Sequence, residues 1–348
     1  MTECKTYKLS EITVMRNGKK RPSSKGPYPV YGGNGIMDYA DCFNAENTII
    51  VGRVGAYCGN VYLCKSKCWV SDNAISVSAN EYVDSRYLYY LMTLLDFHHH
   101  HIGGAQPLMT QDIIGGFEIS LPPLEEQRRI AGILGAIDDK IECNRRINAN
   151  LELQAQALYK QWFVNNRSRE WETLELDKVA KISAGGDKPC ICSKQRTNGC
   201  RVPIFSNGID NEGLYGYTNE SRILEKSITV SARGTIGFVC LRTEPYVPIV
   251  RLISVVPTKE NLSAEFLYLW AITQNISGTG TTQQQLTVPD FKRTSIVVPD
   301  TNLLCKFNEV IMPIFSKIKH NKEVCESLAS LRDTLLPKLM NGEIKVAE

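Results

Sequence analysis

The sequence repeats itself, and a repeat restricts the folds open to a chain more than its composition does. The segment YPVYGGNGI, which begins at Tyr28, corresponds to VPIFSNGI, which begins at Val202. Further along, TIIVGRVGAYCGNVYL at Thr48 corresponds to SITVSARGTIGFVCL at Ser227. Two later pairs keep the same order and an offset of about 177 residues: RYLYYLM (86–92) with EFLYLWA (265–271), and GGAQPLMTQDI (103–113) with GTTQQQLTVPDF (280–291). The shared order and offset predict two similar modules.

Each repeat ends in a long helical segment that carries an apolar seam. Starting at Ile130 and at Phe307, seam residues recur at alternating intervals of four and three, the spacing of a and d positions in a coiled coil. Asparagine stands at the same seam position in both series, at Asn144 and Asn321. At 1.5 Å per residue each segment is about 50–60 Å long. We therefore favour a dedicated helix pair over two amphipathic helices of an ordinary core. The seam positions are Ile130, Leu134, Ile137, Ile141, Asn144, Asn148, Leu151, Leu158 and Trp162 in the first series, and Phe307, Ile311, Ile314, Ile318, Asn321, Leu328, Leu335 and Leu339 in the second.

The ends of both helices carry recognisable signals. Pro122-Pro123 precedes the first helix, and Glu125 and Glu126 follow in its opening turn, where carboxylates suit the positive end of the helix dipole. Pro313 falls early in the second helix and predicts a kink or a later start there. Asn341-Gly342 predicts its C-terminal stop.

The segments that precede the helices are rich in short β-branched runs such as NTIIV, NVYL, AISVS, SITVS and LISVV, separated by Gly, Asn and Pro. This pattern predicts a small, mostly antiparallel sheet in each module, with one short helix near residues 84–95 and its counterpart at 263–273. The predicted fold class is α+β. The predicted order is a β-rich module (1–121), a helical region (122–165), a second β-rich module (166–299) and a second helical region (300–348).

Composition narrows the class of protein. The chain has 348 residues, of which 43% are hydrophobic and 22% charged, as in globular proteins. No apolar run approaches the roughly 20 residues of a membrane span, and the N-terminus lacks the apolar core of an export signal. The 12 cysteines are scattered, so reduced thiols and a cytoplasmic location are expected. The net charge of +3 rules out DNA binding by bulk charge alone, so any nucleic-acid affinity must come from local patches or from partner subunits.

Two similar but non-identical modules on stiff helices suit a protein that contacts two places at once. Duplex DNA presents the same face about every 34–36 Å, which is one helical turn. Because the two modules differ in sequence, we expect the two half-sites to differ as well.

The segment LPPLEEQRRIAGILGAIDDKIECNRRI, which closes the first β-rich module and opens a long helix, resembles the first conserved region of the specificity subunits of type I restriction-modification systems. The resemblance spans essentially the whole chain, and Pro123 to Gln127 is its most specific part. The second region departs from the pattern, because Asp300 to Phe307 lacks the Glu-Gln pair and Pro313 is added. This difference leaves the start of the second helix open.

The resemblance implies two target-recognition domains, each followed by a conserved helical region, and no catalytic activity in this chain. It implies that two methyltransferase subunits and a motor-endonuclease subunit bind to the chain, and that the complex methylates adenine or cleaves DNA at a bipartite, asymmetric double-stranded site. S-adenosylmethionine, ATP and magnesium are expected on those partners, and no cofactor is expected on this chain. The resemblance also implies antiparallel long helices, which would set Asn148 near Asn321 and Asn144 near Cys325.

Base contacts are expected in the loops that differ between the modules, whereas matched positions such as Asn34-Gly35 and Asn207-Gly208, Pro29 and Pro203, or Gly59 and Gly237 are expected to be scaffold. The basic loop Arg16–Lys25 and the unmatched stretch Asp187–Arg201 are candidates for phosphate contact. Arginine and glutamine side chains suit guanine and adenine edges. The candidate DNA-binding residues are Arg16, Lys19, Lys20, Arg21, Lys25, Arg53, Gln106, Gln111, Lys188, Lys194, Arg196, Arg201, Arg233, Gln283 and Gln284.

Other chemistries are weakly supported. His98–His101 is a run of four histidines, but adjacent residues rarely point at one metal, and the cysteine groups Cys64/Cys68 and Cys190/Cys192/Cys200 lack paired CxxC spacing, so no metal site is expected. We find no phosphate-binding loop and no methyltransferase tetrad. Two alternatives stay open: a self-sufficient enzyme that cleaves or modifies DNA through a duplicated binding region, and a helix-hairpin scaffold for protein partners.

Overall fold

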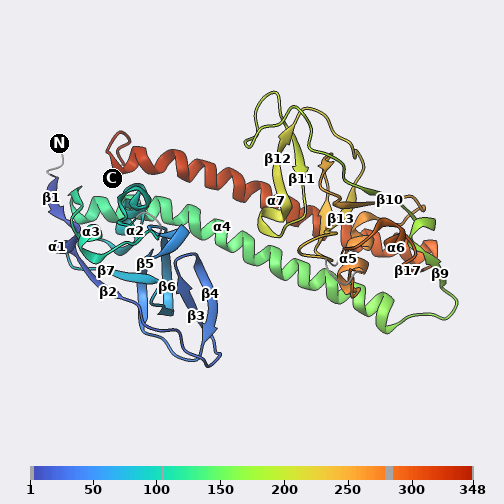
Figure 1. Ribbon diagram of the computed structural model, residues 1–348, viewed down its shortest axis with the longest axis horizontal. Coiled ribbons are helices and arrows are strands. Elements are labelled where there is room, and N and C mark those ends of the chain that lie inside the picture. Colours follow the sequence, from blue (N-terminus) through green and yellow to red (C-terminus); the bar gives the residue numbers. More distant parts are fainter. Residues whose placement is uncertain (1–3, 104–105, 279–284, 347–348) are drawn as a thin grey trace. The chain divides into compact units, whose positions relative to one another are not determined.

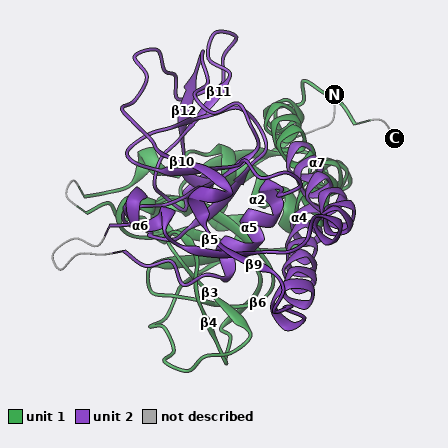
Figure 2. Cartoon of the chain, turned by 90° about the vertical axis from the view of Figure 1, so that its right-hand side faces the viewer, with its two compact units in different colours: residues 1–143, 324–348 green, residues 144–323 purple. Residues whose placement is uncertain are grey.

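The computed structural model describes residues 4–103, 106–278 and 285–346. It contains two compact units: residues 1–143 with 324–348 form unit 1, and residues 144–323 form unit 2 (Figure 2). The two long helices are α4 (Leu124–Tyr159) and α7 (Thr301–Met340) (Figure 1). Each of them is divided between the units. Each unit therefore combines one β-rich module with part of both long helices.

Unit 1 contains a six-stranded sheet in the order β2-β7-β5-β6-β3-β4. All neighbouring strands are antiparallel except β3 and β6, which agrees with the prediction of a mostly antiparallel sheet. A separate pair joins β1 to β8. The elements are β1 (Lys5–Lys8), α1 (Leu9–Ile12), β2 (Thr13–Asn17), β3 (Tyr28–Gly32), β4 (Gly35–Ala40), β5 (Ala45–Gly52), β6 (Val61–Val70), β7 (Ala74–Ala79), α2 (Ser85–Leu94), α3 (Gln111–Gly115) and β8 (Glu118–Leu121), with short 3₁₀ helices at Gly55–Tyr57 and Phe97–His100.

Unit 2 repeats this strand order with one interruption. Its sheets have the orders β10-β16-β13-β14 and β12-β11-β15, and β17 pairs with β9. The single strand β6 of unit 1 corresponds to β14 and β15 together, which are separated by residues 243–246 around Pro245. The elements are β9 (Glu172–Glu175), β10 (Ala180–Ala184), β11 (Val202–Phe205), β12 (Leu214–Thr218), β13 (Ser227–Val230), β14 (Val239–Arg242), β15 (Val247–Pro248), β16 (Ile253–Pro257), α5 (Ala264–Thr273), α6 (Val288–Lys292) and β17 (Ser295–Val298), with 3₁₀ turns at Leu176–Lys178 and Asp210–Gly213 and a π-helical turn at Lys160–Asn165.

The short helices predicted near 84–95 and 263–273 are present as α2 and α5. Asp84 caps α2 by accepting hydrogen bonds from the backbone N–H groups of Arg86 and Tyr87, and Ser263 caps α5 by accepting from Phe266. Capping satisfies amide groups that have no partner inside the helix. Both helices pack their apolar faces on the sheet of their own unit.

The start of α4 matches its sequence signals. The helix begins at Leu124, directly after the two prolines, with Glu125 and Glu126 in its first turn. Gln127 is buried, and its Nε2 donates to the Pro122 carbonyl at 2.9 Å while its Oε1 accepts from the Asp84 amide at 2.9 Å. This side chain fastens the helix start to the loop before α2, which explains the glutamine of the family motif in physical terms.

Pro313 predicts a kink or a later start of the second helix, and of these two the later start is wrong. α7 begins at Thr301, where Asp300 Oδ1 accepts from the Leu303 amide at 2.9 Å, and it continues through Pro313. Leu304, in the position that Gln127 has in α4, is buried instead of hydrogen-bonded. The predicted stop is correct, because the helix ends at Met340 and Gly342 adopts a left-handed φ of 76°.

Within each unit, residues further along α4 contact residues that come earlier in α7. In unit 1, Arg332 Nη1 lies 2.8 Å from Asp138 Oδ1, and the Cys325 thiol donates to the Ile141 carbonyl at 3.7 Å. In unit 2, Asn321 Nδ2 donates to Asn148 Oδ1 at 2.8 Å. All the predicted seam residues are buried or half-buried.

The family resemblance predicts Asn148 near Asn321 and Asn144 near Cys325, and only the first of these pairs lies within one unit. Asn148 and Asn321 meet inside unit 2, as expected, and Asn148 Nδ2 also donates to the Ile318 carbonyl at 3.1 Å. Asn144 is buried and belongs to unit 2, whereas Cys325 belongs to unit 1.

Across the described residues, no helix combines the length and the apolar content that a membrane crossing requires.

Candidate nucleic-acid interface

The basic loop of unit 1 is partly neutralised by an acidic residue of the β3–β4 hairpin. Lys25 Nζ lies 2.7 Å from Asp38 Oδ1, and Arg21 Nη1 lies 3.5 Å from Asp38 Oδ2. The hydrogen bond from Lys25 lowers the pKa of Asp38 below its ordinary value, so the carboxylate stays charged. Two of the five cations of this loop are therefore committed to an internal partner.

Arg16, Lys19 and Lys20 are exposed, and within the described ranges none of them has an acidic partner. Arg16 lies on the edge strand β2, beside a hollow of about 520 Å³ on the open face of the sheet. The hollow is lined by Val14, Arg16, Phe43, Asn44, Ala45, Glu46, Ser76 and Ser78. These three cations form the part of the loop that is available to a phosphate backbone.

The other candidates of unit 1 occupy less open positions. Arg53 is half-buried, and its Nη1 donates to the Asp72 carbonyl at 3.4 Å. Gln111 is half-buried at the first position of α3, whereas Gln106 is exposed. Arg53 and Gln111 are therefore less accessible to DNA than Arg16, Lys19 and Lys20.

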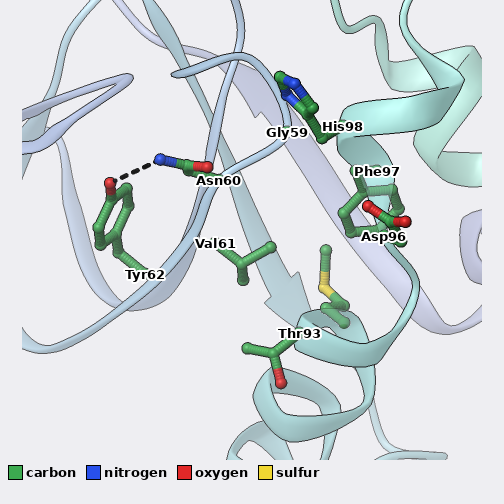
Figure 3. Close-up of a pocket in the computed structure, with 9 residues that line it drawn as sticks. Gly59, Asn60, Val61, Tyr62, Thr93, Asp96, Phe97 and His98 are labelled. Atoms are coloured by element: carbon green, nitrogen blue, oxygen red, sulfur yellow. Dashed lines mark hydrogen bonds between the residues drawn. The ribbon is translucent and has the colours of Figure 1, made fainter. Parts of the chain in front are cut away.

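The histidine run lies in and next to a 3₁₀ turn that packs against the turn at Gly59, beside a cavity of about 340 Å³ (Figure 3). His98 Nδ1 is 3.0 Å from the Cys58 carbonyl, and His99 Nδ1 is 2.7 Å from Asp96 Oδ2. A Cβ atom on Gly59, whose φ is 87°, would lie 2.7 Å from the His98 backbone nitrogen. Position 59 therefore requires glycine, because the backbone of His98 approaches it so closely. The described residues contain no group of His, Cys, Asp and Glu side chains that could hold a metal.

In unit 2 the unmatched stretch 187–201 is bound to the sheet by its backbone. Ser193 and Tyr217 exchange two hydrogen bonds of 2.8 Å, and the Thr218 hydroxyl donates to the Ile191 carbonyl at 2.7 Å. A Cβ atom on Gly216 would lie 2.5 Å from the Ser193 oxygen, so this approach also requires glycine. The stretch is a fixed surface of unit 2.

Tyr215 lies between two lysines on this surface. Lys194 Nζ is 4.1 Å from the ring centre of Tyr215 and Lys188 Nζ is 5.9 Å from it, and both lysines are exposed. Arg196 and Arg201 are exposed as well, and Arg201 donates to Asn198 Oδ1 at 3.3 Å. Exposed cations are the groups that contact the phosphates of DNA, and the Tyr215 ring stabilises the Lys194 ammonium by a cation–π contact.

Arg53 and Arg233 do not occupy equivalent positions in the two units. Met109 N–H donates to the Arg53 carbonyl, and Leu286 N–H donates to the Ala232 carbonyl in the same way. Arg53 therefore corresponds to Ala232, one residue before Arg233. Arg233 is exposed, and its Nε and Nη2 both donate to Gln285 Oε1, at 3.1 and 3.0 Å. Gln283 and Gln284 lie outside the described residues.

Sequence reasoning missed two exposed arginines of unit 2, Arg222 and Arg251. Neither lies in a charge run or in a matched motif, so no local signal marks them. Asn207, which the sequence predicts to be a scaffold residue, has a structural role. Its Oδ1 accepts from the Ala232 amide at 2.8 Å, and its Nδ2 donates to the Val250 carbonyl at 2.7 Å.

These observations define an α+β protein with two β-rich units on two long helices and exposed cations on each unit. The chain matches the family model described as type I restriction modification DNA specificity domain over residues 1–153 and 168–326, and it belongs to that family. It is 28% identical over 330 residues to a chain named as a type I specificity subunit from Mycoplasma pneumoniae, covering 90% of both chains.

A second Mycoplasma pneumoniae chain, also named as a type I specificity subunit, is 31% identical over 276 residues, covering 75% of this chain and 82% of that one. The fold is similar to the crystal structure of a type I restriction-modification system S subunit from M. genitalium. The TM-score is 0.62 at 18% identity, and the similarity covers 97% of this chain and 96% of that one.

Proposed function

We propose that this chain is the DNA-recognition subunit of a type I restriction-modification complex and that each unit reads one half of a bipartite DNA site. The observation that carries the proposal is the extent of the family match, which includes both β-rich modules and most of both long helices. The chain is non-catalytic by itself and acts within a complex. A self-sufficient DNA-modifying enzyme and a helix-hairpin scaffold are not favoured, because the chain matches two relatives named as specificity subunits over 90% and 82% of their lengths.

The proposal includes partners and cofactors. Two methyltransferase subunits bind the helical regions, and a motor-endonuclease subunit joins them. S-adenosylmethionine, ATP and magnesium reside on those partners. The chain itself chooses the DNA for adenine methylation or restriction.

The two half-sites differ, since the cations that face solvent come from different local structures. In unit 1 they include Arg16, Lys19 and Lys20, on an edge strand and the loop after it. In unit 2 they include Lys188, Lys194 and Arg196, on the surface beside β12. Phosphate contacts position a protein on DNA, and differing loops then read different bases.

The experiment that tests the proposed function uses DNA methylation as its readout. The chain is expressed in a bacterial host without adenine methylation, alone and together with a type I methyltransferase subunit from the same genome. Single-molecule sequencing then maps N6-methyladenine. We expect methylation of one bipartite motif only when both chains are present. Methylation or cleavage by this chain alone would contradict the proposal.

We also propose that the α4–α7 pair is an antiparallel coiled coil that sets the spacer between the half-sites. A four-residue insertion beside Asn148, matched by one beside Asn321, adds one helical turn of about 6 Å. At about 3.4 Å per base pair, the preferred spacer should lengthen by about two base pairs, with both half-site sequences unchanged.

A seven-residue insertion at the same two places is the companion variant, because a whole heptad keeps the a and d positions in phase. It should lengthen the spacer by about three base pairs. The same methylation map reports both results. An unchanged spacer in the heptad variant would show that the helices do not set the distance.

A further inference from the structure

The turn that joins β15 to β16 in unit 2 adopts a conformation that its residues disfavour. Val250 has a φ of 52° and Arg251 a φ of 61°. The left-handed region is uncommon for non-glycine residues, and for a β-branched residue such as valine it is a genuine outlier. Two successive residues with positive φ are typical of a type I′ turn, which Asn-Gly favours.

The surrounding backbone holds this turn in place. The amides of Val250 and Arg251 donate to the carbonyls of Gly186 and Gly185 at 3.0 and 2.9 Å, and Leu252 N–H closes the turn on the Ile249 carbonyl at 3.0 Å. Asn207 Nδ2 donates to the Val250 carbonyl at 2.7 Å. A strained conformation persists only where its surroundings determine it this fully.

The equivalent connection in unit 1 has no such strain. There Lys19 N–H donates to the Val70 carbonyl and Gly18 N–H to the Ala74 carbonyl, as Gly185 N–H donates to the Leu252 carbonyl in unit 2. The turn itself is formed by Asp72 and Asn73, and neither has a positive φ. Of the two equivalent turns, only the one in unit 2 is left-handed, and Val250 and Arg251 are the two side chains that it presents.

Both side chains of the turn face solvent. Val250 is 52% exposed and Arg251 is exposed, and no ion-pair partner of Arg251 occurs in the described part of the chain. Two further cations lie near Gly186, whose carbonyl accepts from the Val250 amide. Arg222 Nη1 is 3.1 Å from the position that a Cβ atom on Gly186 would occupy, and Lys188 follows Gly186 by two residues in the sequence. Asp187 is the acidic residue of the same segment.

We propose that the Val250–Arg251 turn is a base-reading element of unit 2, an inference that rests on the proposed function. Arg251 donates to the acceptor atoms of a guanine edge, and Val250 packs against the methyl group of a neighbouring thymine. A contact to phosphate alone tolerates a range of positions and offers nothing to an exposed valine. A base edge demands fixed geometry, which the clamped turn supplies, while Arg222 and Lys188 hold the adjacent backbone.

The test replaces the turn by the sequence that its backbone prefers, V250N/R251G, in the full chain with its methyltransferase partner. Removing the strain should raise Tm by about 2–4 °C if it relieves about 1 kcal/mol in a unit of this size. At the same time the methylation map should lose its base preference at one or two positions of one half-site. The expected fall is about 10- to 100-fold per position, with the other half-site unchanged.

The matched control is D72N/N73G in the equivalent turn of unit 1, which should leave the unit 2 half-site unchanged. An unaltered motif in V250N/R251G would overturn the inference. So would a motif that keeps its sequence while methylation falls uniformly and becomes more sensitive to salt, because that result identifies a phosphate contact. If the wild-type chain and its partner methylate no specific motif, the proposed function itself fails, and that outcome is seen before any variant is compared.

Discussion

Replacing Phe307 with alanine is expected to lower the free energy of unfolding of unit 2 by about 3–5 kcal/mol. Phe307 is completely buried on α7, and its ring centre lies 4.7 Å from that of Phe163 and 5.6 Å from that of Trp162. The ring of Phe266 on α5 lies 6.1 Å away. The side chain therefore joins α7 to the π-helical turn that follows α4 and to the short helix α5. Its removal leaves a cavity among ring systems that cannot collapse to fill it.

Urea unfolding followed by tryptophan fluorescence measures this effect. Three of the four tryptophans, Trp162, Trp171 and Trp270, belong to unit 2, so the signal reports mainly on that unit. The control is Met312→Ala on the same helix, where the side chain is 43% exposed and the change should stay within about 0.5 kcal/mol. A Phe307→Ala variant as stable as the control would show that the aromatic cluster does not hold unit 2 together.

The fold was predictable where a long period or a repeat carried the information. The alternating four-three spacing averages over many turns, so it located both helices and their seam. The antiparallel packing that the family resemblance implies then placed Asn148 near Asn321. Single-residue rules were weaker. Pro313 predicts an interruption worth about 3 kcal/mol, but Leu304, Phe307 and Ile311 precede it and are buried. Burying three such side chains stabilises the helix by more than the proline costs, at about 1.5–3 kcal/mol each.

The candidate interface was predictable only in outline. The basic loop was found by its composition, yet the neutralisation of Arg21 and Lys25 depends on the hairpin that brings Asp38 beside them. Arg53 and Arg233 stand one residue apart in corresponding turns, and their hydrogen bonds to Asp72 and to Gln285 depend on segments that are distant in the sequence. The turn at Val250 and Arg251 has no sequence signal at all, since its conformation is imposed by the carbonyls of a distant segment.

Replacing Asn321 alone with leucine is expected to destabilise the helix pair by about 1–3 kcal/mol. Asn321 is buried, and its Nδ2 donates to Asn148 Oδ1 at 2.8 Å. The single change removes that donor and leaves the Asn148 oxygen in an apolar seam without its partner. An exposed asparagine on the same helix as Asn148, Asn150, provides the control, and Asn150→Leu should change stability by less than about 0.5 kcal/mol.

The double variant N148L/N321L separates stability from register. With both amides gone, no polar group is stranded, so the double variant should be as stable as the wild type or more stable, and the coupling energy in the double-mutant cycle should be large. A buried asparagine at a seam position fixes the alignment of two helices at some cost in stability. If the pair sets the spacer, the double variant should therefore methylate sites with a broader range of spacers although it unfolds no more easily. A double variant that is strongly destabilised, or that keeps a single spacer, would mean that the apolar seam alone determines the register.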